Sequence, residues 1–211
     1  METKSIKLKT VIISSASVII LDVMVSALFP KGIFPAIVLL GIIRMIEISL
    51  LILIVLKIEK GLSPIGLTLK AVIPGIKKGI LWSVGFGLIT AIAFSIMYLA
   101  NIDAFKLIGS RLPKDQNDLI FYFVVGGIIG PVAEEIFFRG ILYGFLRRFG
   151  AVVAILLSTA AFAVFHPVGS GIPITQIIGG ILFAVSYEFE KNLFVPIVIH
   201  TSGNLSIFLL S

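Results

Sequence analysis

The stretch from Leu119 to Leu146 reads LIFYFVVGGIIGPVAEEIFFRGILYGFL and places two carboxylates and one guanidinium inside an apolar run. A run of this length can cross a bilayer as one helix, because a span needs about 20 apolar residues. A charge near the bilayer centre costs about 2.5–3.5 kcal/mol even on the lenient insertion scale. We therefore expect Glu134, Glu135 and Arg139 to face other helices or water, and to serve a function.

The whole chain has the composition of an integral membrane protein. Of its 211 residues, 58% are hydrophobic and 13% are charged, and the mean hydropathy is +1.16. Soluble domains are about 45–50% apolar and about 25% charged. The net charge of +6 comes from Lys and Arg at the ends of apolar segments, which indicates topology signals and headgroup contacts and no nucleic-acid partner. Cysteine is absent, which excludes disulfides, Cys metal sites and a thiol nucleophile.

Hydropathy predicts an all-α, polytopic transmembrane helix bundle that forms a single domain over 1–211. A basic, proline-containing segment at about 63–78 is expected to lie along the membrane surface as an amphipathic element. It separates N-terminal spans in 1–78 from a catalytic core in 79–211. The N-terminal run lacks a small-residue cleavage pattern and is expected to be a retained span. The predicted spans number about seven: 10–29, 33–56, 79–100, 119–146, 150–166, 172–188 and 193–210.

The distribution of basic residues predicts the orientation of this multi-pass chain. If the N-terminus is cytoplasmic, most Lys and Arg residues lie on the cytoplasmic side. The outer side then carries only Lys31, Lys106, Arg111 and Lys114. The positive-inside rule therefore favours a cytoplasmic N-terminus and an external Ser211.

Two further polar clusters occur in the late spans. His166 follows Phe162 by four residues, and Asn204 follows His200 by four, so each pair shares a helix face. Pro167 disfavours helical geometry at the residue before it, which places His166 at a helix end.

The depths of these clusters can be compared by folding the spans back on one another. Glu134 then lies about 21 Å above the inner turn, and His166 about 6 Å higher, at about 1.5 Å per residue. His200 and Asn204 lie about 10 and about 14 residues above their own turn, in the same band. We therefore expect one site near the middle of the membrane.

The backbone near Glu134 carries its own signals. Pro131 lacks an amide hydrogen, so it is expected to disrupt the helix and free carbonyls that need other partners. Gly126, Gly127 and Gly130 let a neighbouring helix or a substrate backbone approach closely.

Each cluster also has a simpler explanation. Glu135 and Arg139, at i and i+4, can neutralise each other structurally, which leaves Glu134 free to act as a base in a cavity. Arg44 and Glu47 form a second i, i+3 pair that we interpret as stabilising. A histidine on an apolar helix is as often a hydrogen-bonded packing residue as a functional one.

Taken together, the three clusters resemble the motifs of a known family. Residues 134–139 match EExxxR, 162–166 match FxxxH and 200–204 match HxxxN, in this order and in three late helices. The pattern is similar to that of the CAAX protease and bacteriocin-processing enzyme family, also called CPBP or Abi. The resemblance covers about residues 80–207, and the first two predicted spans have no such match.

This resemblance implies a hydrolase, namely an intramembrane endopeptidase. Eukaryotic members of the family remove the last three residues of prenylated proteins, and bacterial relatives are tied to bacteriocin processing or immunity. By position, Glu134 resembles the general base that activates a water together with His166. His200 and Asn204 resemble the pair that stabilises the oxyanion. The expected substrate is a membrane protein or peptide, and the sequence leaves open whether it is prenylated.

The family is often called metalloprotease, so a metal has to be considered. Glu134, His166 and His200 could hold zinc as a three-ligand catalytic site. No HExxH motif is present, and Glu135 could act as the base only if it left Arg139, with which it resembles a structural pair. We favour a mechanism that requires no cofactor and keep zinc as the alternative.

Two other classes of function remain from the sequence. Intramembrane Glu and His residues also mark ion pathways, so a proton- or ion-coupled transporter is one alternative. The absence of an inverted repeat in the sequence disfavours it. A non-enzymatic membrane scaffold is the other alternative, which the intact motifs disfavour.

Overall fold

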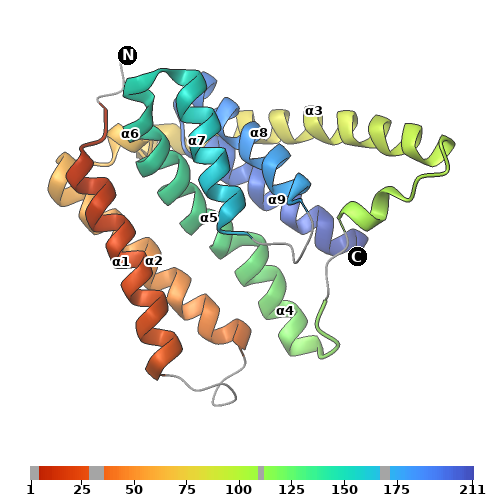
Figure 1. Cartoon of the computed structure of the whole chain (residues 1–211), viewed down its shortest axis with the longest axis horizontal. Coiled ribbons are helices and arrows are strands. Elements are labelled where there is room, and N and C mark those ends of the chain that lie inside the picture. The colour runs from red at the N-terminus through yellow and green to blue at the C-terminus, as the bar shows by residue number, and fades with distance from the viewer. Residues whose placement is uncertain (1–4, 29–35, 109–111, 167–171) are drawn as a thin grey trace.

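The computed structural model describes residues 5–28, 36–108, 112–166 and 172–211, and in this part the chain forms helices and turns but no strand. The predicted all-α class is thus confirmed. The helices are α1 (Leu8–Leu28), α2 (Ala36–Glu59), α3 (Val72–Leu99), α4 (Gln116–Val124), α5 (Gly130–Glu135), α6 (Gly144–Leu146), α7 (Ala151–Val164), α8 (Ile174–Glu190) and α9 (Phe194–Leu210), as Figure 1 shows.

The segment from Gln116 to Phe149 is one composite helix. Two π-helical stretches, Val125–Ile129 and Ile136–Tyr143, join α4 to α5 and α5 to α6. A π-helical turn holds an extra residue and occurs often at functional sites. Here the two stretches flank Glu134 and Glu135 on α5.

The predicted spans correspond in order to α1, α2, α3, the composite helix, α7, α8 and α9. Within the described residues, four helical segments are long and apolar enough to cross a membrane: Leu8–Val25, Ala36–Glu59, Ser63–Leu99 and Gln116–Phe149. The last three helices have 14, 17 and 17 residues. A full count of seven spans therefore stays a prediction.

The segment predicted at 63–78 is not one separate element, because its second half belongs to α3. Two 3₁₀ turns, Ser63–Ile65 and Leu69–Ala71, precede α3. Helix α3 then begins at Val72 and includes Pro74 in its first turn. Pro74 does not interrupt this helix, because the first N–H groups of a helix have no intrahelical partner and a proline there costs little.

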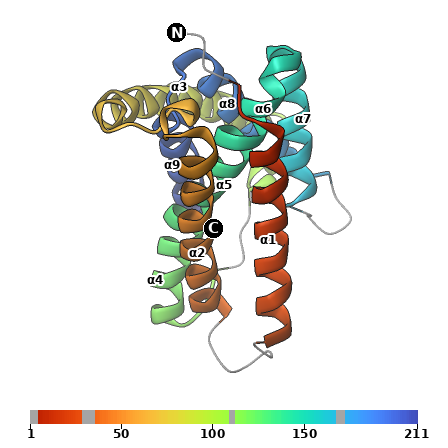
Figure 2. The ribbon, with the colours of Figure 1, turned by 90° about the vertical axis from the view of Figure 1, so that its left-hand side faces the viewer.

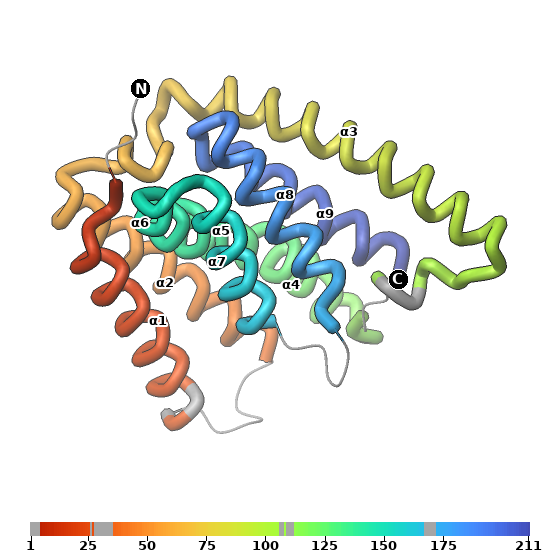
Figure 3. The backbone as a smooth tube through the Cα atoms, turned by 45° about the horizontal axis from the view of Figure 1, so that its top comes forward, coloured from red at the N-terminus to blue at the C-terminus, as the bar shows by residue number. Residues whose placement is uncertain are grey.

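The composite helix lies between two groups of helices. Helices α1 and α2 lie side by side next to it, and α7, α8 and α9 lie on its other side (Figures 1 and 2). The predicted pair of Arg44 and Glu47 forms on α2, which contacts α5. Figure 3 shows α3 running beside α9.

Two glycines explain how closely α3 approaches α9. A β-carbon built on Gly75 would lie 2.6 Å from the β-carbon of Phe194, and one on Gly79 would lie 2.6 Å from that of Val198. Only glycine allows such close contact between helix backbones. The rest of α3 is largely exposed, as expected for a helix that faces lipid.

An aromatic and aliphatic cluster supports the region of the three motifs. It brings together side chains of the composite helix, α7, α8 and α9: Phe138, Phe162, Phe183, Val195 and Ile199. Because this cluster joins four helices, it fixes the relative positions of the polar residues that those helices carry.

Candidate active site

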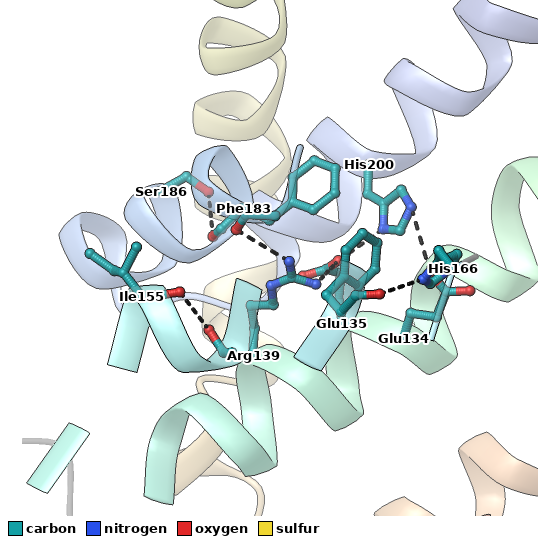
Figure 4. A network of polar contacts seen from close by, with 11 residues as sticks. Glu134, Glu135, Arg139, Ile155, His166, Phe183, Ser186 and His200 are labelled. Carbon is teal, nitrogen blue, oxygen red and sulfur yellow. Dashed lines mark hydrogen bonds and ion pairs between the residues drawn. The ribbon is translucent and has the colours of Figure 1, made fainter. Parts of the chain in front are cut away.

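The three sequence motifs meet at one place. Glu134 on α5, His166 just after α7 and His200 on α9 come together although they are far apart in sequence (Figure 4). Glu134 Oε2 lies 3.4 Å from His166 Nε2 and 3.8 Å from His200 Nε2. Both imidazoles thus present the same nitrogen to one carboxylate oxygen.

The hydrogen bond at the other nitrogen of His166 defines what its Nε2 can do. His166 Nδ1 lies 2.8 Å from the carbonyl oxygen of Phe162, which only accepts, so Nδ1 carries the proton. In neutral His166, Nε2 then offers a lone pair. Glu134 Oε2 is buried and has no hydrogen-bond partner among the described residues. Two acceptors therefore face each other across 3.4 Å, and a donor such as a water molecule can satisfy both.

His166 lies where the sequence predicted, at a helix end. Helix α7 ends at Val164, and the amide of His166 donates to the carbonyl of Ala163. The ring of Phe162 lies 4.4 Å from the imidazole, between ring centres. The FxxxH spacing thus gives Phe162 two contacts with His166, one from its carbonyl and one from its ring.

Glu135 forms the expected ion pair and a second bond that the sequence did not predict. Its Oε1 lies 2.8 Å from Arg139 Nη1 and 2.8 Å from His200 Nδ1. The side chains of Glu135 and Arg139 are both fully buried. Glu135 therefore fixes the orientation of the His200 imidazole and directs Nε2 toward Glu134.

Aromatic rings enclose the buried charges. Phe183 stacks on His200, with ring centres 4.5 Å apart and planes 21° apart. The Arg139 guanidinium lies 4.6 Å from the ring centre of Phe162 and 5.1 Å from that of Phe183. Arg139 also donates to the carbonyl of Gly180. Phe183 belongs to no motif, and its only sequence signal is its position on the helix before HxxxN.

Asn204 lies one turn after His200 on α9 and is held by the irregular backbone of the composite helix. The N–H of Gly130 donates to the carbonyl of Val125, and Pro131 has no N–H, so the Gly126 carbonyl lacks a helical donor. Asn204 Nδ2 supplies it at 2.9 Å. The expectation that Pro131 frees a carbonyl is therefore confirmed, although the helix continues through the proline.

The glycines of the composite helix allow α9 to approach. A β-carbon on Gly127 would lie 2.5 Å from Leu205 Cδ2, and one on Gly126 would lie 3.3 Å from Phe208 Cζ. This agrees with their predicted role in close helix packing. The approach brings Asn204 within reach of the Gly126 carbonyl.

Zinc ligands can be compared with the residues present. Glu134, His166 and His200 are the donor types of a catalytic zinc site, and each imidazole bonds through Nδ1 to an oxygen, as zinc-binding histidines do. Within the described residues, however, no group of three such side chains has an arrangement that could hold a metal ion. Glu135 Oε1 is also engaged by Arg139 and His200, which leaves no obvious second base.

Comparison with known proteins agrees with the motifs. A family model described as Type II CAAX prenyl endopeptidase Rce1-like matches residues 116–206. This region is therefore similar to the Rce1-like CAAX prenyl endopeptidase family. The matched residues include Glu134, His166, His200 and Asn204. They also include the two π-helical stretches.

The chain is also similar to a protein named as a CAAX protease. The membrane-embedded CAAX protease MroQ of Staphylococcus aureus (strain USA300) is 32% identical over 111 residues, which make up 49% of this chain and 42% of that protein. The match thus spans less than half the length of the relative. No solved structure matches the chain significantly.

Proposed function

We propose that the chain is an intramembrane endopeptidase that hydrolyses a peptide bond in a membrane protein or peptide. The observation that carries the proposal is the buried, unpartnered Glu134 Oε2, which lies 3.4 Å from the lone pair of His166. Similarity to CAAX proteases over residues 116–206 supports a peptide substrate.

A water molecule between Glu134 and His166 would be well oriented for attack. It would donate one hydrogen to Glu134 Oε2 and the other to His166 Nε2, so that an oxygen lone pair points at the substrate carbonyl. Glu134 then removes a proton as the C–O bond forms, which is general base catalysis. His166 needs no second proton for this role, because its Nδ1–H already donates to Phe162.

His200 and Asn204 would stabilise the oxyanion of the tetrahedral intermediate. Because Nδ1 of His200 bonds to Glu135, this role requires a hydrogen on Nε2 as well, and that hydrogen would be donated to the oxyanion. Asn204 Nδ2 uses one hydrogen for Gly126 and has a second one available. Donors held in place before the reaction stabilise the developing charge without reorganisation.

Collapse of the intermediate completes the reaction. Protonated Glu134 gives the water proton to the leaving nitrogen, the C–N bond breaks, and a new carboxyl group and an amine leave the site. The mechanism needs no cofactor, and zinc remains the alternative. We also propose a cytoplasmic N-terminus, on the basis of the distribution of Lys and Arg.

The proposal is tested by cleavage of peptides by the purified protein in lipid nanodiscs. Substrates that end in a CAAX sequence, with and without a prenyl group, are analysed by mass spectrometry. We expect cleavage by the wild-type protein and none by Glu134→Gln, because an amide cannot accept the proton. Equal cleavage by both proteins would overturn the role of Glu134. A folded wild-type protein that cleaves no membrane peptide would favour the scaffold or transporter, which flux assays separate.

A further inference from the structure

Arg44 on α2 carries a charge inside an apolar helix, and the mechanism above does not use it. It also lies outside residues 116–206, which match the family model. Its Nη1 lies 2.5 Å from Glu47 Oε2. A guanidinium has five N–H donors, and Glu47 is the only hydrogen-bond partner of Arg44 among the described residues. The other donors therefore remain available to a ligand.

Two contacts of α2 place Arg44 beside α5 (Figures 1 and 2). Gly41 packs on the composite helix, because a β-carbon built on it would lie 2.8 Å from Val125 Cγ2. Leu51 belongs to the core cluster that contains Ile136. Arg44 lies between these two contacts on α2, and Val125 and Ile136 flank α5 on the composite helix. Residues three apart share a helix face, so Arg44 is on the face of Gly41 that meets the composite helix.

The guanidinium of Arg44 is close to the catalytic groups. It interacts electrostatically with both Glu134 and His166. The side chain of Arg44 is 24% exposed, that of Glu134 is 15% exposed and that of His166 is 31% exposed. Unpaired N–H groups are costly in lipid, so those of Arg44 belong on the side of the active site and its water.

We propose that Arg44 binds a carboxylate of the substrate and thereby selects which peptides are cleaved. The inference rests on the proposed peptidase function. A guanidinium binds a carboxylate through two parallel N–H···O bonds, which are stronger than bonds to neutral acceptors. Glu47 holds Arg44 in place through one N–H and leaves the others for this second carboxylate. The carboxylate has two possible sources, namely the free C-terminus of the peptide and an acidic side chain near the cleaved bond.

The other charges near Arg44 permit a second anion. Arg44 interacts electrostatically with Glu134 and with Asp22 on α1, but neither forms an ion pair with it. Among the described residues, only Glu47 is in contact with the guanidinium. Coulomb energy falls as charges separate. A substrate carboxylate in direct contact therefore gains more from Arg44 than it loses to the more distant acids.

The test measures binding of two peptides that differ only at the C-terminus, which is a free carboxylate in one and an amide in the other. The protein carries Glu134→Gln, so that cleavage does not interfere, and fluorescence anisotropy in nanodiscs gives the affinities. We expect the free acid to bind at least about tenfold more tightly than the amide. Adding Arg44→Gln should abolish this preference and leave the affinity for the amide unchanged.

The amide peptide is the internal control, because general damage to the fold weakens the binding of both peptides. A second pair of amidated peptides exchanges one Glu for Gln near the cleavage position. A preference for the acid that depends on Arg44 in the first pair assigns the carboxylate to the C-terminus. The same result in the second pair assigns it to the side chain.

Two further variants keep the test independent of folding. Arg44→Gln leaves Glu47 buried without its counter-charge, so the double variant with Glu47→Gln removes both charges. Glu47→Gln alone is the matched control for the double variant, since it keeps the guanidinium and should keep the preference for the acid. Arg44→Lys keeps the charge but cannot form two parallel bonds, so it should keep only part of the preference.

Equal affinities within both pairs of peptides, or a preference that survives the loss of Arg44, would overturn the inference. Neither result affects the peptidase function, which the cleavage assay tests separately. A preference that requires Arg44, in a wild-type protein that cleaves no peptide, would retain the carboxylate site and contradict the peptidase.

Discussion

Glu135 accepts hydrogen bonds from His200 and from Arg139 through the same oxygen, each at 2.8 Å. The ion pair of the EExxxR motif therefore also holds His200 of the HxxxN motif in place. A pair that serves only stability would make no contact with His200. The shared oxygen instead couples the stability of the site to the orientation of its imidazole.

This coupling predicts that stability and activity separate in a double variant. Glu135→Gln leaves Arg139 buried without its counter-charge and should lower the free energy of unfolding by about 3 kcal/mol or more. Adding Arg139→Met removes the unpaired charge and should restore most of that stability. Cleavage should stay low, because His200 still lacks its anionic acceptor. Thermal unfolding and kcat measured on the same preparations test this, and recovery of kcat in the double variant would contradict the role of Glu135.

Asn204 is predicted to act on both catalysis and packing. Asn204→Ala should lower kcat by about 10²–10³, the usual effect of losing an oxyanion donor. It should also cost about 1 kcal/mol of stability, because the Gly126 carbonyl loses its donor.

The Pro131→Ala background is the control for the packing effect of Asn204. It supplies an N–H near the Gly126 carbonyl, so Asn204→Ala should cost less stability there, with no gain in kcat. Equal stability losses in both backgrounds would show that the proline does not create the need for Asn204.

Metal dependence is predicted to be absent. Incubation with a strong zinc chelator should leave kcat/KM unchanged, and elemental analysis should find far less than one metal ion per chain, because Glu134 serves as the base. Loss of activity on chelation and its return with added zinc would instead make Glu134, His166 and His200 metal ligands.

Two glycines on α3 should respond to alanine in opposite ways. At Gly79 a β-carbon would lie 2.6 Å from the β-carbon of Val198, which can move only with the α9 backbone. Gly79→Ala should therefore destabilise by about 1–3 kcal/mol, as overpacked sites do. Gly85→Ala, with open space around it, should stabilise by up to about 1 kcal/mol from helix propensity alone. Unfolding temperatures in the same detergent compare the two, and equal shifts would argue against the close packing of α3 on α9.

Much of the helix order could be predicted from the sequence, because hydropathy reports burial in lipid directly. Depth along each helix followed from residue counts, which is why Glu134, His166 and His200 were expected at one level. Pro167 also marked the end of α7 near His166.

Side-chain direction could not be predicted in the same way. The π-helical stretches Val125–Ile129 and Ile136–Tyr143 hold extra residues, so a regular 3.6-residue projection loses the correct phase on both sides of α5. The sequence therefore predicts the pair of Glu135 and Arg139 but neither the bond from Glu135 to His200 nor the stack of Phe183 on His200. Such contacts depend on how helices rotate against one another, which local sequence does not specify.

The most direct test of the central claim is a single-turnover comparison of wild-type protein, Glu134→Gln and Glu59→Gln on one membrane peptide. Glu59→Gln is the matched control, because it makes the same change at a buried glutamate that bonds to Lys7 and Thr10, away from the site. We predict that Glu134→Gln lowers the rate of bond cleavage by at least about 10³ while the peptide still binds, and that Glu59→Gln retains cleavage within about tenfold of wild type. Cleavage by folded Glu134→Gln at the wild-type rate would contradict the account.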